Sequence, residues 1–477
     1  MAAAGATDSN LRPDASARTD ASGPSRWRRW PGYRTVWRWH FYAGLFCIPF
    51  VLWLSVTGTI YLFKPQIDAW LDRPFEHLDV EGPAASAAAQ ISAALAAVPG
   101  ARLNAYELPR TPRSAARVLL DRGGDLVRVY VHPRSTAVLR VIDEDARFTR
   151  QIFHLHGELM LGDRGSMLIE LAASWIIVML LTGLFLWWPR SGGLAGIVYP
   201  RLGGGQRTFW RDLHAVTGFW VSLLALFLLV SGLPWAKSWG SLLKQVRQLS
   251  SETVVRQDWP TGATSERKER IADAAANTDH ARHGGHGGSV SAAAPVLLDE
   301  VAIERMLASV RALDLAPPVL LAPPTGREPH WTARSDAQNR PLRVNLVLDA
   351  ESGAVLERSD FADRPLLDRV IGVGVAAHEG QLFGWFNQAL GVFTTSGLVL
   401  VSISATVLWW RRRQPGTLGA PAALASATTL PIAFFAIVAG LGILLPLLGL
   451  SMLGLGAIEF GVLRRIAPVR AFLGLGT

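Results

Sequence analysis

Residues 168–190 read LIELAASWIIVMLLTGLFLWWPR, an apolar stretch that ends in two tryptophans, a proline and an arginine. A helix needs roughly 20 apolar residues to cross about 30 Å of hydrocarbon, so this stretch is long enough to span a membrane. Tryptophan is enriched where a span meets the headgroups, and arginine where a span ends in the cytoplasm. The stretch therefore predicts a transmembrane helix over 168–188 that ends on the cytoplasmic side.

Four other stretches share this apolar character: 39–63, 214–236, 388–410 and 421–463. The last is nearly uncharged and long enough for a fifth and a sixth span, which we expect to form a helical hairpin. Half of all residues are hydrophobic and the mean hydropathy is positive, so a soluble enzyme is excluded. The sequence predicts a polytopic α-helical membrane protein.

The basic residues give the expected orientation. Arginines precede the first span and follow the second, the fourth and the hairpin, which places all of these ends in the cytoplasm. Orientation also accounts for the net charge of +9, so we expect contact with membrane lipid and no nucleic acid. Residues 1–38 are then a disordered cytoplasmic tail and 189–213 a cytoplasmic loop, while 64–167 and 237–387 lie on the outer side.

The spacing of the first span recurs in the third. His40 is followed at +4 by Gly44 and at +18 by Gly58. The corresponding residues of the third span are His214, Gly218 and Gly232. This match indicates an internal duplication.

The segments between the spans repeat as well. His156 and His378 each lie six residues before a glycine and 31 before a tryptophan. Residues 129–143 and 345–360 alternate apolar and polar residues around a turn, which is typical of a β-hairpin. Each hairpin follows a helical stretch, at about 85–98 and 298–313. Each half therefore predicts a span, a small α+β domain and a second span.

One insertion, 250–295, interrupts the repeat. It contains three histidines, His280, His283 and His286, in the run HARHGGHGG. These histidines can bind a metal loosely, but nothing fixes their geometry, and the composition favours a flexible linker.

The repeated histidines are the candidate functional residues. Ionisable residues near a membrane span are costly and tend to be functional, and imidazole is a common axial ligand of haem iron. The four ligands His40, His156, His214 and His378 suit two six-coordinate haems. Cys47 is the only cysteine, so covalent haem attachment is excluded and two haem b groups are expected.

Depth in the membrane predicts how the ligands pair. His40 and His214 open spans at the cytoplasmic face, whereas His156 and His378 precede spans at the outer face. We expect one haem between the members of each pair. The alternative is that each histidine only forms hydrogen bonds at the interface.

Glycines accompany the predicted ligands. Gly44 and Gly218 lie one helical turn from their histidines, where the missing side chain leaves room for a flat porphyrin. Gly58 and Gly232 lie roughly 27 Å away along the span, where we expect them to make room for the outer haem. These glycines can equally serve close helix packing.

His154 is a rival to His156 for the ligand role. The two residues are about 200° apart around a helix, so they cannot share one face. We expect His154 either to support a ligand from behind or to lie on the substrate side of the site.

Four motifs in order resemble the PepSY-associated transmembrane family: H-x3-G opening a span that ends in TG, HGELMLG, LWWPR, and HEGQLFG before LWWRRR. The resemblance covers roughly 35–413. It implies a multi-pass protein of the bacterial inner membrane with its N-terminus in the cytoplasm and two periplasmic PepSY-type domains. Some members of this family resemble haem-containing reductases of ferric siderophores.

These features together predict a di-haem b oxidoreductase that passes electrons outward to a ferric siderophore or similar ferric chelate. No P-loop or Rossmann motif occurs in a suitable context, so electrons must come from a membrane quinol or a separate reductase. Two alternatives remain: a non-enzymatic scaffold that binds a periplasmic partner, and an iron-chelate transporter. The sequence names no catalytic residue beyond the haem ligands.

Overall fold

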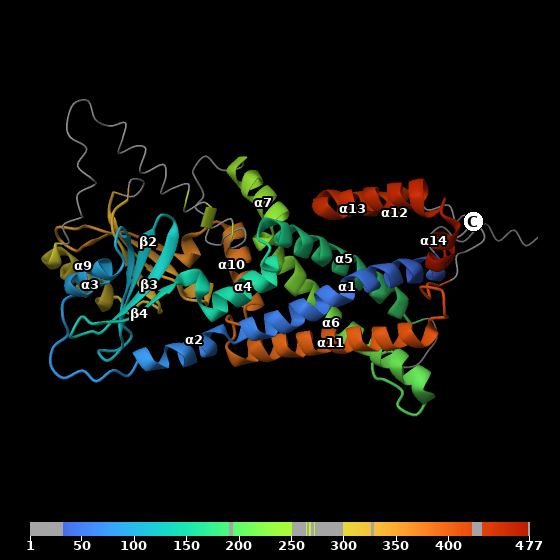
Figure 1. The fold of residues 1–477 in the computed structure, drawn as a ribbon, viewed down its shortest axis with the longest axis horizontal. Helices are drawn as coiled ribbons and strands as arrows, with labels where there is room; N and C mark the ends of the chain where they lie inside the picture. The colour runs from blue at the N-terminus through green and yellow to red at the C-terminus, as the bar shows by residue number, and fades with distance from the viewer. Residues whose placement is uncertain are drawn as a thin grey trace, which may run out of the picture.

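The computed structural model describes residues 32–189, 194–249, 264, 267–268, 271, 299–325, 329–421 and 432–475. Most of the predicted tail and the three linker histidines, His280, His283 and His286, lie outside these ranges. In the described part, long helices form an elongated bundle with a sheet domain at one end (Figure 1).

Four long apolar helices build the bundle, and each begins three to nine residues before the span predicted there. They are α1 (Tyr33–Leu62), α5 (Asp163–Trp187), α6 (Gly205–Gly232) and α11 (Trp385–Arg412). Helices satisfy their backbone hydrogen bonds internally, which lipid requires. Among the described residues, these four (α6 extended to Trp235) and Pro446–Leu463 are long and apolar enough to cross a membrane. The predicted class, a polytopic helical membrane protein, is confirmed.

The sheet domain has two halves of the same order, a helix followed by four antiparallel strands. The first half contains α3 (Ala87–Ala97), β1 (Arg102–Glu107), β2 (Ala116–Arg122), β3 (Asp125–Val131) and β4 (Val138–Asp143). The second contains α9 (Glu300–Ala312), β5 (Val319–Ala322), β6 (Trp331–Ser335), β7 (Val344–Leu348) and β8 (Val355–Asp360). The two predicted β-hairpins are β3–β4 and β7–β8.

The two halves form one domain, so the expectation of two separate α+β domains was wrong. The strand order is β4-β3-β2-β1-β5-β6-β7-β8, and β1 pairs with β5 antiparallel, with Tyr106 opposite Leu321. Alone, each half would leave its first strand as an exposed edge with unpaired backbone groups. Pairing β1 with β5 removes both edges and produces one eight-stranded sheet.

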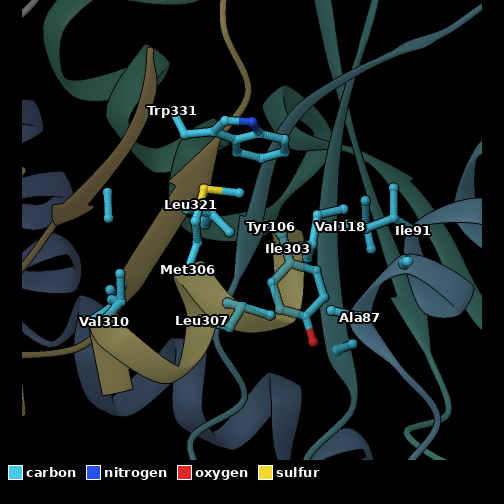
Figure 2. Close-up of a cluster of buried hydrophobic side chains, with 14 of the residues drawn as sticks. Ala87, Ile91, Tyr106, Val118, Ile303, Met306, Leu307, Val310, Leu321 and Trp331 are labelled. Carbon is cyan, nitrogen blue, oxygen red and sulfur yellow. The ribbon is translucent and has the colours of Figure 1, made fainter. Parts of the chain in front are cut away.

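A single hydrophobic core covers both halves. Ile91 of α3 and Leu307 of α9 lie over the same face of the sheet as Tyr106, Val118 and other core residues (Figure 2). The Tyr106 hydroxyl lies 2.8 Å from the Gln90 side-chain oxygen, to which it donates, so this buried polar group is satisfied. Because each half contributes residues to one core, neither half is complete alone.

Short helices connect the sheet to the bundle. On the first half these are α2 (Lys64–Asp72), η2 (Arg73–Phe75), η3 (Glu144–Ala146) and α4 (Phe148–Glu158). On the second half they are η4 (Leu233–Trp235), α7 (Lys237–Leu249), η6 (Phe361–Asp363) and α10 (Leu366–His378), while η5 (Arg340–Leu342), between β6 and β7, contacts α10. Arg117, on the face of β2 away from the core, pairs with Glu76 beyond η2 and with Glu107 of β1, which fastens the first connection to the sheet.

The C-terminal region contains α12 (Ile432–Leu444), α13 (Pro446–Ile458), the π-helical turn η7 (Glu459–Leu463) and α14 (Ala467–Leu473). A Cβ atom on Gly449 would lie 2.7 Å from the Gly442 carbonyl oxygen, so the chain folds back here as a hairpin. Of the two spans predicted here, Pro446–Leu463 is long and apolar enough to cross a membrane. The 13 described residues of α12 extend about 20 Å, and residues 422–431 before them lie outside the described ranges, so the other span stays a prediction.

Candidate functional site

Two of the predicted ligands meet inside the bundle. His40 lies on α1 and His214 on α6, and their ring centres are 6.3 Å apart with the ring planes inclined by 76°. They lie near the end of the bundle remote from the sheet (Figure 1). We call His40 and His214 the inner pair.

Backbone carbonyls fix the tautomer of the inner pair. His40 Nδ1 lies 3.1 Å from the Met179 carbonyl oxygen and 3.1 Å from Thr182 Oγ1. His214 Nδ1 lies 3.1 Å from the Val401 carbonyl oxygen. A carbonyl oxygen only accepts, so Nδ1 carries the proton in both rings and Nε2 keeps its lone pair. That nitrogen is the one available to a metal ion.

The other two predicted ligands lie at the sheet end of the bundle. His156 is on α4 and His378 is the last residue of α10. Burial, with a smaller contribution from His378, lowers the pKa of His156 to about 4, and burial lowers the pKa of His378 to about 4. Both rings are therefore neutral at ordinary pH, the state in which imidazole binds metals. We call His156 and His378 the outer pair.

Hydroxyl groups fix the tautomer of the outer pair. His156 Nδ1 lies 2.9 Å from Thr57 Oγ1, and that hydroxyl donates its own proton to the Trp53 carbonyl at 2.8 Å. Since a hydroxyl has one proton, Thr57 must accept from Nδ1–H. The same arrangement joins His378 to Ser231, whose hydroxyl donates to Phe227. Nε2 is again left with its lone pair.

Gly58 and Gly232 lie against the imidazoles of the outer pair, and the expectation that they make room for a haem stays a prediction. A Cβ atom on Gly58 would lie 3.2 Å from His156 Cε1, and one on Gly232 would lie 3.3 Å from His378 Cε1. Gly183 does the same for His40, at 3.1 Å. Each glycine lets a helix backbone approach an imidazole edge.

Gly44 and Gly218 face less crowded surroundings. Among the described residues, and apart from the glycine's own stretch of helix, a Cβ placed on Gly44 meets only Met179 Sδ, at 3.9 Å, and one on Gly218 meets only a Val401 methyl, at 4.0 Å. The room beside these two glycines is consistent with a flat group on the histidine face, and that role stays a prediction.

The dipeptides that support the rings follow the internal repeat. Thr57-Gly58 and Ser231-Gly232 support the outer pair. Thr182 and Ser404, each 26 residues after an outer-pair histidine, support the inner pair. The sequence predicted Thr57-Gly58 and Ser231-Gly232 only as the ends of two spans, and their contact with the outer-pair imidazoles was missed. The shared spacing of Thr182 and Ser404 was present in the sequence but had no meaning without the helix packing.

His154 points away from His156 and is held by acids. Its Nδ1 lies 3.2 Å from a Glu158 carboxylate oxygen and its Nε2 lies 3.8 Å from Asp145. Hydrogen bonds to Asp145 and Glu158, opposed by partial burial, raise the pKa of His154 to about 9. A protonated imidazole has no lone pair for a metal ion, so this arrangement favours His156 as the ligand.

Each histidine pair supplies two ligands and no more. In the described ranges, no group of three or more His, Cys, Asp or Glu side chains could hold a metal ion. A protein cage of three or four ligands, as zinc requires, is therefore not built from these residues. Two imidazoles are the set that an iron porphyrin needs, because the macrocycle supplies the other four ligands.

One known protein family matches the part of the chain that contains both histidine pairs and the sheet domain. The family model for the PepSY-associated TM region matches residues 37–412. The chain belongs to the PepSY-associated TM family. The matched region contains all four histidines of the inner and outer pairs and the complete sheet domain of this PepSY-associated protein. Among curated proteins, none matches the chain.

Proposed function

We propose that this PepSY-associated protein is a di-haem b oxidoreductase of the bacterial inner membrane that reduces a periplasmic ferric chelate such as a ferric siderophore. The observation that carries the proposal is the set of four repeat-related histidines in two pairs, each donating its Nδ1 proton and keeping its Nε2 lone pair. Neutral imidazole in this tautomer is an axial ligand for haem iron.

The spacing of the inner pair supports the proposal. When two imidazoles hold one metal ion from opposite sides, with bonds of about 2.0 Å and ring centres about 1.1 Å beyond each nitrogen, the ring centres are about 6.2 Å apart. The distance between the His40 and His214 ring centres is 6.3 Å. The distance between the ring centres therefore matches the value expected if one iron ion were held between the two imidazoles.

The roles of the protein follow from this arrangement. The inner and outer pairs would each hold one haem, and the haem would supply reversible one-electron transfer. We assign the arginine-rich end of the bundle to the cytoplasm and the sheet domain to the periplasm. A membrane quinol or a separate reductase provides the electrons. One quinol loses two electrons and two protons to become a quinone, which suffices to reduce two Fe(III) ions to Fe(II). Hard oxygen ligands hold Fe(II) less tightly, so reduction releases the iron.

Haem content of the purified full-length chain tests the proposal. We expect about two non-covalent haem b groups per chain, with low-spin spectra of bis-histidine ligation, in optical and electron paramagnetic resonance measurements. His330→Ala, at an exposed position outside both pairs, is the matched control and should keep both haems. Folded, haem-free protein would exclude the reductase and leave the scaffold or transporter.

A further inference from the structure

The two histidine pairs differ in the oxygen atoms that accept their Nδ1 protons. In the inner pair, each Nδ1 faces a backbone carbonyl and a hydroxyl: Met179 and Thr182 for His40, Val401 and Ser404 for His214. In the outer pair, His156 Nδ1 has the Thr57 hydroxyl as its one partner among the described residues, and that hydroxyl has already donated its proton elsewhere. His378 faces the Ser231 hydroxyl, and the Leu228 carbonyl acts on the same ring, so the contrast with the inner pair is clearest at His156.

The hydrogen-bond acceptor at Nδ1 controls how strongly Nε2 donates electron density to a metal ion. A strong acceptor draws the Nδ1 proton away and makes the ring more basic at Nε2, so the ligand stabilises the more highly charged ion. Ligand hydrogen bonding is one of the means by which a protein tunes the potential of a haem. An amide carbonyl is a stronger acceptor than a neutral hydroxyl. The inner imidazoles should therefore stabilise Fe(III) more than the outer ones.

The hydrogen-bond lengths at Nδ1 reduce the expected difference in acceptor strength between the two pairs but do not reverse it. The outer contacts, at 2.9 Å, are shorter than the inner carbonyl contacts, at 3.1 Å. Each inner Nδ1–H, however, has two oxygens within 3.3 Å, one of them a carbonyl. The donated bond of Thr57 strengthens its oxygen as an acceptor by only about 10 to 30 per cent.

We infer that Thr57 is a positioning residue: its hydroxyl draws the imidazole proton less strongly than the inner carbonyls do, so the outer pair has a higher reduction potential than the inner pair and the hydrogen bonds behind the ligands direct electrons outward. This inference rests on the proposed function. It requires no charge movement and no conformational change. The direction is set by which oxygen atom each helix presents to an imidazole.

Spectroelectrochemical titration of the purified, haem-loaded chain tests the inference. We expect two separate midpoint potentials, and His214→Ala, which removes an inner ligand, should leave only the higher one. Equal potentials, or a lower potential remaining in His214→Ala, would overturn the inference although haem is bound. A chain without haem would instead overturn the proposed function along with it.

Thr57→Val then measures the effect of the hydroxyl alone on the outer potential, because valine has nearly the same shape as threonine and accepts no hydrogen bond. The variant should raise the outer potential by about 59 mV. For one electron, this shift changes the equilibrium constant for electron transfer between the two sites about tenfold. Thr57→Ser should restore the original value. The matched control is Thr182→Val, which should move the inner potential far less because His40 keeps the Met179 carbonyl. Equal shifts in the two valine variants, or no shift in Thr57→Val, would contradict the assigned role of Thr57.

Discussion

Three imidazoles of the site, those of His40, His156 and His378, are held at three points: a polar acceptor at Nδ1, a glycine at the ring edge, and the helix that carries the histidine. For His156 these are Thr57, Gly58 and α4, and α4 is itself pinned to α1 by a hydrogen bond from the Trp53 indole to the Leu155 carbonyl. An imidazole restrained in this way loses little freedom when it binds a metal. The arrangement is what a preorganised ligand site requires.

Removal of single ligands should reveal the pairing. We expect His40→Ala and His214→Ala to lose the same haem signal, about half of the total, because their rings are adjacent. His156→Ala and His378→Ala should lose the other half. His154→Ala should keep both signals, since its ring is occupied by Asp145 and Glu158. Haem content and low-temperature optical spectra measure these losses; one shared signal lost in His40→Ala and His156→Ala would refute the pairing.

Sequence spacing predicts the four histidines but not their hydrogen-bond partners. The spacing places His40 and His214 at equal depth because a straight helix advances a fixed distance per residue. Whether Met179 or another carbonyl faces His40 depends on the rotation of α5 about its own axis, which packing determines. The same holds for the surroundings of Gly58: its distance along α1 was predictable, whereas the imidazole beside it belongs to α4.

At the scale of elements, the main discrepancy between sequence and structure is the joined sheet. Alternating residues predict the β3–β4 and β7–β8 hairpins, since the pattern is local. The pairing of β1 with β5 links residues more than two hundred positions apart, and nothing in the sequence of either strand predicts which strand it pairs with. The same holds for α3 and α9, which were expected to cover two separate domains and instead cover one core.

The shared core predicts cooperative behaviour of the two halves. Leu307 of α9 is fully buried, so Leu307→Ala should destabilise the sheet domain by about 2 to 5 kcal/mol. Native-state hydrogen exchange of the full-length protein should then show lower protection in β2 and β3 as well as in β6 and β7. Leu342→Ala, at a side chain that is 51% exposed, is the control and should change little. Loss confined to β5–β8 would show that the halves fold independently.

On the scale of the whole molecule, the two histidine pairs lie too far apart for one group to serve both. His40 and Thr57, which contacts His156, are 17 residues apart on α1, so the pairs are separated by about 26 Å along the helix. That distance is most of the hydrocarbon thickness. The sheet domain adjoins only the outer pair, through α4 and α10 (Figure 1). A ferric chelate that docks against the sheet domain therefore has no need to cross the membrane.

If the proposed function is right, this layout predicts that electrons reach an acceptor beside the sheet domain, and vesicles allow that prediction to be measured. Chains reduced with dithionite, freed of it and inserted with the sheet domain outward should reduce an external ferric hydroxamate, giving about two Fe(II) per chain because each haem holds one electron. Ferrozine added outside traps and counts the product. His378→Ala should suppress this reduction even when the inner haem remains bound and reducible, since the outer pair is the only one beside the sheet domain. His330→Ala, which leaves both pairs intact, should behave as the wild type. Wild-type rates in His378→Ala would mean that electrons leave by a route that avoids the outer pair, and the siderophore-reductase proposal would then have to be abandoned.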